Sequence, residues 1–327
     1  MIPDWLALSD SAPSGAVPPL MERGLFVVEF TLPLDRATTL LSHEADAGWP
    51  RALSLLADPE RGLTLTHRQG PTVTRHHLPG PLPVLRGVAR VSFTFDAPAR
   101  LWRMTFEIIG LPGHNRSAHG IAPLPFATAD LQALAMAPRH PHLLWFGATP
   151  ARTLPARAPW LGLRTRIDTD RGPVEAARLR PGDRILTLDD GPMPLRRVIR
   201  RKLPSRGSFA PILLRSPFFG LHGDILVSSD QLLLISGASV EYLWGAEEVL
   251  VPASALCDGK VAEREERRSV TETLALDLGR PALIIADGTC LLSACGAEAQ
   301  MPRRTLASWE TPPLMSLLGR TALRRVA

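Results

Sequence analysis

The chain has 327 residues, of which 45% are hydrophobic and 21% charged, a balance typical of a folded globular protein and not of a disordered one. Its 32 prolines and 25 glycines exclude an architecture of long helices and favour short strands joined by turns. The length predicts two domains of about 150 residues each. The formal net charge is +5, and the arginines are spread along the chain, so no nucleic-acid partner is expected.

The chain carries three cysteines, Cys257, Cys290 and Cys295, whose spacing fits neither a disulfide framework nor a metal-binding knuckle. We expect them to pack as small apolar residues, and we predict no cofactor and no metal. The N-terminal residues lack the basic start of a Sec-type signal, and no apolar run reaches the roughly 20 residues of a membrane span. The location is therefore open between the cytoplasm and export by another route.

Residues 1–22 are predicted to form a flexible lead, and residues 23–148 a β-sandwich domain. Short runs with strand-like alternation, separated by turns, are the evidence for the sandwich. These runs lie at residues 24–32, 53–56, 62–67, 88–95, 101–109 and 143–146, with an extended connector at 78–83.

One helix is predicted in this domain, at residues 129–136. Thr128 is expected to cap it, Pro138 to stop it, and Leu131, Leu134 and Ala135 to form its apolar stripe.

The sequence FTFDAPAR at residues 93–100, followed by W-x-x-T-F-E at 102–107, resembles the hairpins of concanavalin-like and laminin-G-like jelly rolls. This resemblance implies a carbohydrate-binding module. Trp49 and Trp102 are then the candidate stacking residues, with core packing as the alternative for Trp102.

Two histidine pairs are candidate metal ligands. His140 and His142 would share one face of a strand, but the nearby sequence supplies no third ligand. We therefore favour surface histidines, and the same interpretation applies to His76 and His77.

A linker is predicted at residues 149–159, where TPARTLPARAP is rich in proline and alanine. It precedes a second domain at residues 160–300 and a basic C-terminal tail at 301–327. The run LRRVIRRKLPSR at residues 195–206 is predicted to be an edge strand with a solvent-exposed, basic side. Later strands are expected at residues 211–215 and 248–253, and residues 224–235 are expected to form a strand, a turn and a second strand. The strands at 274–278 and 283–285 are expected to pair with each other.

The second domain resembles the Hint domain, the self-processing module shared by hedgehog proteins and inteins, here of the bacterial type. Its opening follows the family order of valine, leucine, Gly-Asp, an aliphatic residue and threonine, at Val174, Leu179, Gly182, Asp183, Ile185 and Thr187. DILVSSDQLLLI at residues 224–235 and EVLVPASAL at 248–256 match two later family blocks. The resemblance covers about residues 158–294 and implies a mostly β fold with few short helices.

The resemblance also implies a reaction and its residues. In the family the first residue, Cys or Ser, attacks the preceding carbonyl, and a Thr-x-x-His block supplies a helper hydroxyl and a proton donor. When Arg164-Thr165 is aligned with the family's Gly-Thr pair, Trp160 takes the nucleophile position. Ser228 then takes the place of the threonine, and Gln231 that of the histidine.

These replacements remove the reactive groups. Indole has no nucleophilic lone pair, and an amide does not titrate near neutral pH. His222 is the one histidine of the predicted second domain, so it is a weak candidate for a relocated acid, with an ordinary turn residue as the alternative. We therefore predict a degenerate Hint domain that serves as a structural or interaction scaffold for an unknown protein or glycan partner. The alternatives are self-cleavage with an atypical nucleophile and carbohydrate binding by the sandwich.

Overall fold

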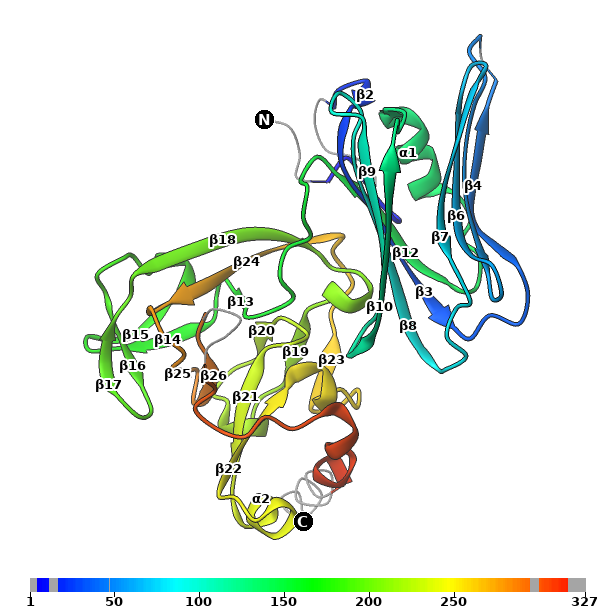
Figure 1. Cartoon of the computed structure of the whole chain (residues 1–327). Helices are drawn as coiled ribbons and strands as arrows, with labels where there is room; N and C mark the ends of the chain where they lie inside the picture. The colour runs from blue at the N-terminus through cyan, green and yellow to red at the C-terminus, as the bar shows by residue number, and fades with distance from the viewer. Residues whose placement is uncertain (1–4, 12–16, 47, 295–299, 317–327) are drawn as a thin grey trace. The chain divides into compact units, whose positions relative to one another are not determined.

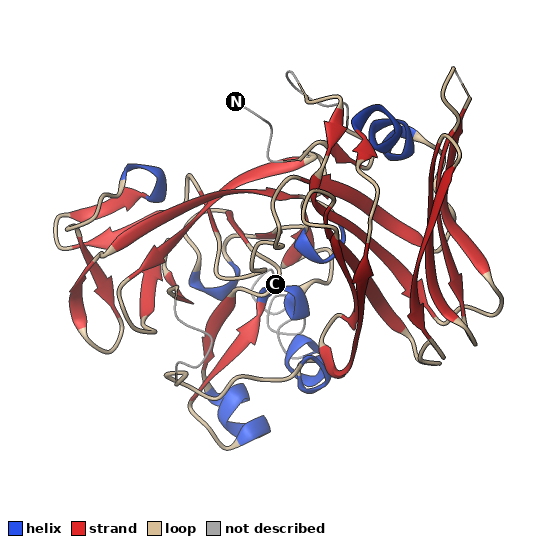
Figure 2. Ribbon diagram, turned by 45° about the horizontal axis from the view of Figure 1, so that its top comes forward, coloured by secondary structure: helices blue, strands red, loops and turns tan. Residues whose placement is uncertain are grey.

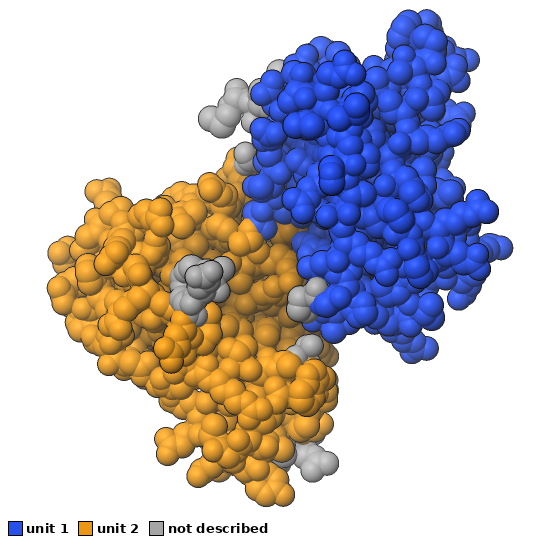
Figure 3. All heavy atoms as spheres, viewed as in Figure 1, with its two compact units in different colours: residues 1–155 blue, residues 156–327 orange. Residues whose placement is uncertain are grey.

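The computed structural model describes residues 5–11, 17–46, 48–294 and 300–316. The chain forms two compact units, which we call unit 1 (residues 1–155) and unit 2 (residues 156–327) (Figure 3). Both consist mainly of antiparallel strands with few short helices (Figure 2), so the predicted mostly β architecture is confirmed. Cys295 lies outside the described residues. Within the described residues, no helix is both long and apolar enough to cross a membrane.

Unit 1 contains two large antiparallel sheets (Figure 1). The first has the strand order β1 (Ala7–Leu8), β12 (Leu143–Thr149), β3 (Arg23–Leu32), β8 (Gly87–Asp96), β9 (Leu101–Ile108) and β10 (Leu111–Ile121). The second has the order β4 (Thr38–Ala45), β5 (Arg51–Asp58), β6 (Gly62–Gln69) and β7 (Thr72–Pro79). A short pair, β2 (Leu20–Met21) and β11 (Phe126–Ala127), precedes the helix α1 (Thr128–Met136).

Alternation along the strands turns one face of each sheet towards a shared core. Phe26, Val28 and Phe30 of β3 belong to the same buried cluster as Leu53 and Leu65 of the second sheet. This single cluster between two sheets is what makes unit 1 a sandwich, because each sheet buries its apolar face against the other.

Unit 2 contains two further antiparallel sheets. One has the order β18 (Arg197–Pro204), β24 (Val270–Asp277), β13 (Leu161–Gly162), β20 (Ile225–Val227), β19 (Ile212–Leu214) and β23 (Ala262–Arg264). The other has the order β15 (Gly172–Glu175), β14 (Arg166–Thr169), β16 (Arg184–Thr187), β25 (Leu283–Ala286), β26 (Thr289–Leu292), β21 (Leu232–Ser236) and β22 (Glu248–Pro252), with β17 (Gly191–Pro194) paired to β16. Unit 2 also contains the helix α2 (Ala238–Trp244).

One buried cluster joins the two sheets of unit 2, with Ile212, Val227 and Leu274 from the first and Ile167 and Ile284 from the second. The central strand β13 is only two residues long, yet Leu161 pairs with both Val227 and Leu274. This short strand therefore fixes the residue just before it, Trp160, next to the end of β20.

Some details differ from the sequence-based expectations. Part of the predicted flexible lead is ordered, because Trp5 to Leu8 are buried and β1 pairs with β12. Thr128 is not the helix cap: Ala127 holds that position without a side-chain hydrogen bond. Its predicted stripe of Leu131, Leu134 and Ala135 is buried as expected.

The predicted pairing of the two late strands is also wrong. Strand β24 pairs with β18 and β13, whereas β25 pairs with β26, β14 and β16. The described part of the predicted tail, residues 301–316, packs in unit 2: Leu306 and Leu314 are buried in its core, and Leu306 N donates to Leu250 O at 2.9 Å.

Candidate functional site

The candidate site forms where the chain enters β13 beside the end of β20. Because Leu161 pairs with Val227, the preceding residue Trp160 faces the following residue Ser228. Trp160 N donates to Ser228 Oγ at 3.1 Å, and Ser228 N donates to Trp160 O at 2.8 Å. The peptide nitrogen that follows Pro159 is thus held by a hydroxyl oxygen that accepts its hydrogen.

The indole of Trp160 is buried and makes both packing and hydrogen-bond contacts. Its side chain is buried, with 6% of the residue exposed, and packs with Leu203 and Ala275 in a small cluster of its own. Indole Nε1 donates to Ala156 O at 2.5 Å. The chain between Ala156 and Trp160 is therefore closed into a turn by the tryptophan itself.

Gln231 is fully buried, with 0% of the residue exposed. Its Nε2 donates to Leu292 O at 2.9 Å and to Leu232 O at 3.2 Å. A side-chain amide has two N–H hydrogens, so both are committed to backbone carbonyls. Its Oε1 is buried without a hydrogen-bond partner among the described residues, and Gln231 N donates to Ser228 O at 3.0 Å.

A second link ties the entering chain to the same loop of unit 2. The guanidinium of Arg157 lies 2.9 Å from a carboxylate oxygen of Asp230. Together with the two backbone bonds between Trp160 and Ser228, this ion pair fixes residues 157–160 against residues 228–230. We call this set of contacts, including the indole bond to Ala156, the entry clasp.

The structure does not bring all predicted site residues together. Thr165 is buried and its Oγ1 has no partner among the described residues, while its backbone bonds to Gly162 O and from Ala176 N belong to the turn after β13. His222 is exposed, and its N donates to Asp287 O in the turn between β25 and β26. Trp160, Ser228 and Gln231 form one connected set, whereas the recorded contacts of His222 belong to a different turn.

Three partners of this site were missed by the sequence reasoning: Ala156, Asp230 and Leu292. Ala156 and Leu292 contribute only backbone carbonyls, which leave no signal in a side-chain pattern. Asp230 carries a charge, but its pairing with Arg157 spans a long stretch of sequence and needs the β13–β20 register to be known.

The other candidates are accounted for by packing. Burial raises the pKa of the Cys257 and Cys290 thiols, which disfavours the reactive thiolate. The rings of His140 and His142 stack, and His142 Nδ1 lies 2.8 Å from Thr31 Oγ1. Within the ranges that the structure covers, no group of three or more His, Cys, Asp or Glu could hold a metal ion.

The two predicted stacking tryptophans differ in surroundings. Trp102 packs against Phe93 and His76 at the unit 1 core, as the core-packing alternative expects. Trp49 is exposed and its ring lies over Gly70 in the turn between β6 and β7. Carbohydrate binding by Trp49 stays a prediction.

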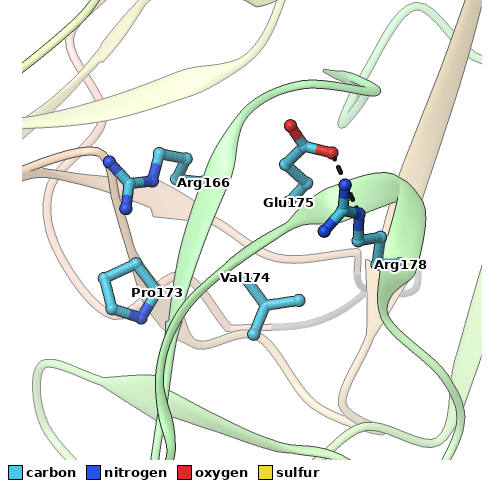
Figure 4. Close-up of a pocket in the computed structure, with 5 residues that line it drawn as sticks. All are labelled: Arg166, Pro173, Val174, Glu175 and Arg178. Carbon is cyan, nitrogen blue, oxygen red and sulfur yellow. Dashed lines mark ion pairs between the residues drawn. The ribbon is translucent and has the colours of Figure 1, made fainter.

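A hollow of about 480 Å³ lies on the β14–β15 hairpin and is lined by Arg166, Pro173, Val174, Glu175 and Arg178 (Figure 4). Arg178 Nε lies 3.3 Å from Glu175 Oε2. Its lining carries charges of both signs and is open to solvent, so we assign no reaction to it.

Comparisons with known proteins concern unit 2. Residues 162–295 match the family model of the Hint domain. A search of the curated proteins gave no match. Among solved structures, the chain is similar to the crystal structure of the MchDnaB-1 intein, with 14% sequence identity and a TM-score of 0.28, over 41% of this chain and 99% of the intein chain. By the family-model match, residues 162–295 of unit 2 are similar to the Hint domain.

Proposed function

We propose that this Hint domain does not cleave its own chain and that it serves as a structural and interaction scaffold. The observation that carries the proposal is the entry clasp: the position expected for the nucleophile holds a buried indole that donates to Ala156 O. On this proposal, the place where the family would break the chain instead fastens the chain to unit 2.

The chemistry supports this reading at both required positions. Cleavage needs a nucleophile on the residue after the scissile bond, and a donor that protonates the departing nitrogen. The indole N–H is a hydrogen-bond donor and has no lone pair available to attack a carbonyl. Gln231 has already committed both amide hydrogens to Leu292 O and Leu232 O. Ser228 Oγ accepts from Trp160 N–H, so in this arrangement the hydroxyl does not protonate that nitrogen.

The decisive experiment measures the mass of the purified chain before and after long incubation with a small thiol. We expect a single intact chain, because no group at the site can attack the Pro159 carbonyl. Fragments that separate between Pro159 and Trp160 would overturn the proposal and favour self-cleavage with an atypical nucleophile.

Restoring the missing groups gives a sharper form of the same test. In Trp160→Cys with Gln231→His, the thiolate can attack the Pro159 carbonyl, the peptide C–N bond breaks as a thioester forms, and the imidazolium gives its proton to the nitrogen. An external thiol then releases the N-terminal part by exchange. We expect slow, thiol-dependent cleavage in this double variant and almost none in either single variant, because the acid contributes about 10²–10⁴ in rate.

The matched control is Trp160→Ala with Gln231→His. It opens the same cavity and adds the same histidine but has no thiol, so it should stay intact. Equal cleavage in this control would show that loss of the indole, not nucleophilic attack, breaks the chain.

A further inference from the structure

The basic run of unit 2 forms the last strand of its sheet. Strand β18 pairs with β24 alone among the described strands, in an unbroken register from Arg197↔Asp277 to Pro204↔Val270 (Figure 1). It contains no bulge, and no proline occurs before Pro204. Its outer edge therefore presents backbone N–H and C=O groups in the spacing that an added strand requires.

The side chains along this edge carry one sign of charge. Residues 196–202 include the exposed cations Arg196, Arg197, Arg200, Arg201 and Lys202 and no acidic residue. Two of them are paired with β24: Arg197 with Asp277 at 2.6 Å and Lys202 with Glu272 at 3.6 Å.

Arg200 and Arg201 are different. Across the ladder they face Leu274 and Thr273, which carry no charge. The guanidinium of Arg200 donates to Ala177 O at 2.6 Å, and that of Arg201 to Arg200 O at 3.3 Å. In the described part of the chain, neither has a carboxylate within ion-pair distance, so their charge is available to a partner.

We propose that the outer edge of β18 binds an acidic, extended segment of a partner protein as an additional strand. This inference rests on the proposed scaffold role and names the class of partner. Charged edges normally protect a sheet from unwanted pairing. Because all the charges here are positive, two such edges repel each other, whereas an acidic strand is attracted.

The arrangement favours a peptide over a nucleic acid. Successive side chains of a strand point to opposite faces of the sheet, so Arg200 and Arg201 lie on opposite faces. A strand added in the plane of the sheet places carboxylates on both faces and reaches both arginines. A phosphate backbone lying on one face would meet one of them and would leave the edge amides unpaired.

The test uses the full chain and a capped synthetic peptide, as long as β18, in which pairs of glutamates alternate with pairs of valines, so that carboxylates lie on both faces of the added strand. We expect it to bind more weakly as salt is raised and to slow hydrogen–deuterium exchange at residues 197–203. The same peptide with lysine in place of glutamate should not protect these amides. The double reversal Arg200→Glu with Arg201→Glu should weaken binding about tenfold or more, since each exposed pair changes from attraction to repulsion.

The control reversal is Arg171→Glu, an exposed arginine in the β14–β15 turn, which should bind the peptide like the original chain. If the double reversal at Arg200 and Arg201 unfolds the protein, Arg200→Gln with Arg201→Gln replaces it. This neutral variant should weaken peptide binding measurably, but less than the reversal does. The inference is overturned if exchange at residues 197–203 is unchanged by the acidic peptide, or if a single-stranded oligonucleotide binds these arginines and the peptide does not. The intact mass of the same samples tests the scaffold proposal separately, because none of these variants removes a contact of the entry clasp.

Discussion

At the scale of single residues, the entry clasp shows which features of a site a sequence can predict. The family alignment placed Trp160 and Ser228 together, and the structure joins them by two hydrogen bonds. The alignment could not predict the hydrogen bonds of Gln231, which stands where a histidine is expected. Gln231 donates to Leu292 O, a backbone atom 61 residues away. A replaced residue can be read from sequence, whereas its new partners depend on long-range packing.

His67 of β6, which no motif singled out, and His76 of β7, which was expected at the surface, are both buried, so the expectation for His76 is wrong. Only 3% and 2% of these residues are exposed, and His67 Nδ1 and His76 Nε2 are buried without partners among the described residues. Their rings stack on Phe126 and contact Phe93. Burial lowers the pKa of each to about 4, and the nearby His76 lowers the pKa of His67 further, while Asp130 opposes this shift.

These pKa values predict acid sensitivity in unit 1. A histidine with a folded pKa of about 4 and an unfolded value of 6.5 binds fewer protons when folded, so its contribution to stability is lost as pH falls from 6.5 towards 4. The loss approaches about 3 kcal/mol per histidine at the low end. Chemical unfolding followed from neutral pH to about pH 4 should show a steep fall in unfolding free energy.

His67→Leu with His76→Leu should flatten that fall while leaving stability at neutral pH equal or higher, because the unpartnered ring nitrogens are replaced by apolar atoms. The exposed histidine variant His119→Leu on β10 is the control and should keep the original pH dependence. An unchanged slope in the double variant would mean that other groups cause the acid sensitivity.

At the scale of elements, strands rich in alternating apolar residues were predicted, whereas the long strands β4, β7 and β10 of unit 1 were missed. Strands β4, β7 and β10 carry threonine, histidine, proline or glycine at many positions. These residues weaken the alternation signal, since each of these strands is held by its neighbours in the ladder more than by its own apolar face. Strand β10 pairs with β9 from Arg116↔Phe106 to Ile121↔Leu101, after a register shift between Leu111 and Arg116, although β10 alone has little strand propensity.

Gly120 on β10 tests whether contacts with the neighbouring strand β9 stabilise β10. A Cβ atom at Gly120 would lie 2.7 Å from the indole of Trp102, and that indole packs on Phe93 and His76. Gly120→Ala should therefore displace a packed ring and lower the free energy of unfolding by about 1–3 kcal/mol. Ser117→Ala, an exposed site on the same strand, should change it by less than about 0.5 kcal/mol. Equal values for the two variants would show that Trp102 moves aside without cost.

At the scale of the whole molecule, composition and the Hint resemblance predicted two mostly β parts. The strand orders could not be predicted, because neighbours such as β13 and β24 are far apart in sequence and are chosen by tertiary packing. The connecting stretch shows the same limit. It has the composition of a flexible linker throughout, yet the entry clasp fixes its second half against unit 2.

Limited proteolysis with trypsin separates these two halves of the linker. Sequence alone makes Arg152 and Arg157 equal targets. In the structure both are paired, but the Arg152 side chain is 61% exposed and lies 3.4 Å from Asp96, whereas that of Arg157 is 25% exposed and lies 2.9 Å from Asp230. Because a protease needs a locally mobile chain, we expect the first cut after Arg152, leaving two folded fragments.

Asp230→Asn should remove the ion pair and raise the cutting rate after Arg157, while Asp224→Asn, at another exposed ion pair of unit 2, should not. Fragment masses identify each site. A first cut after Arg157 in the unaltered chain would mean that the clasp opens on the timescale of digestion. First cuts within residues 172–256 would mean instead that the Hint domain opens before the linker does. The position of the first cut therefore reports whether the entry clasp holds residues 157–160 against unit 2 during digestion.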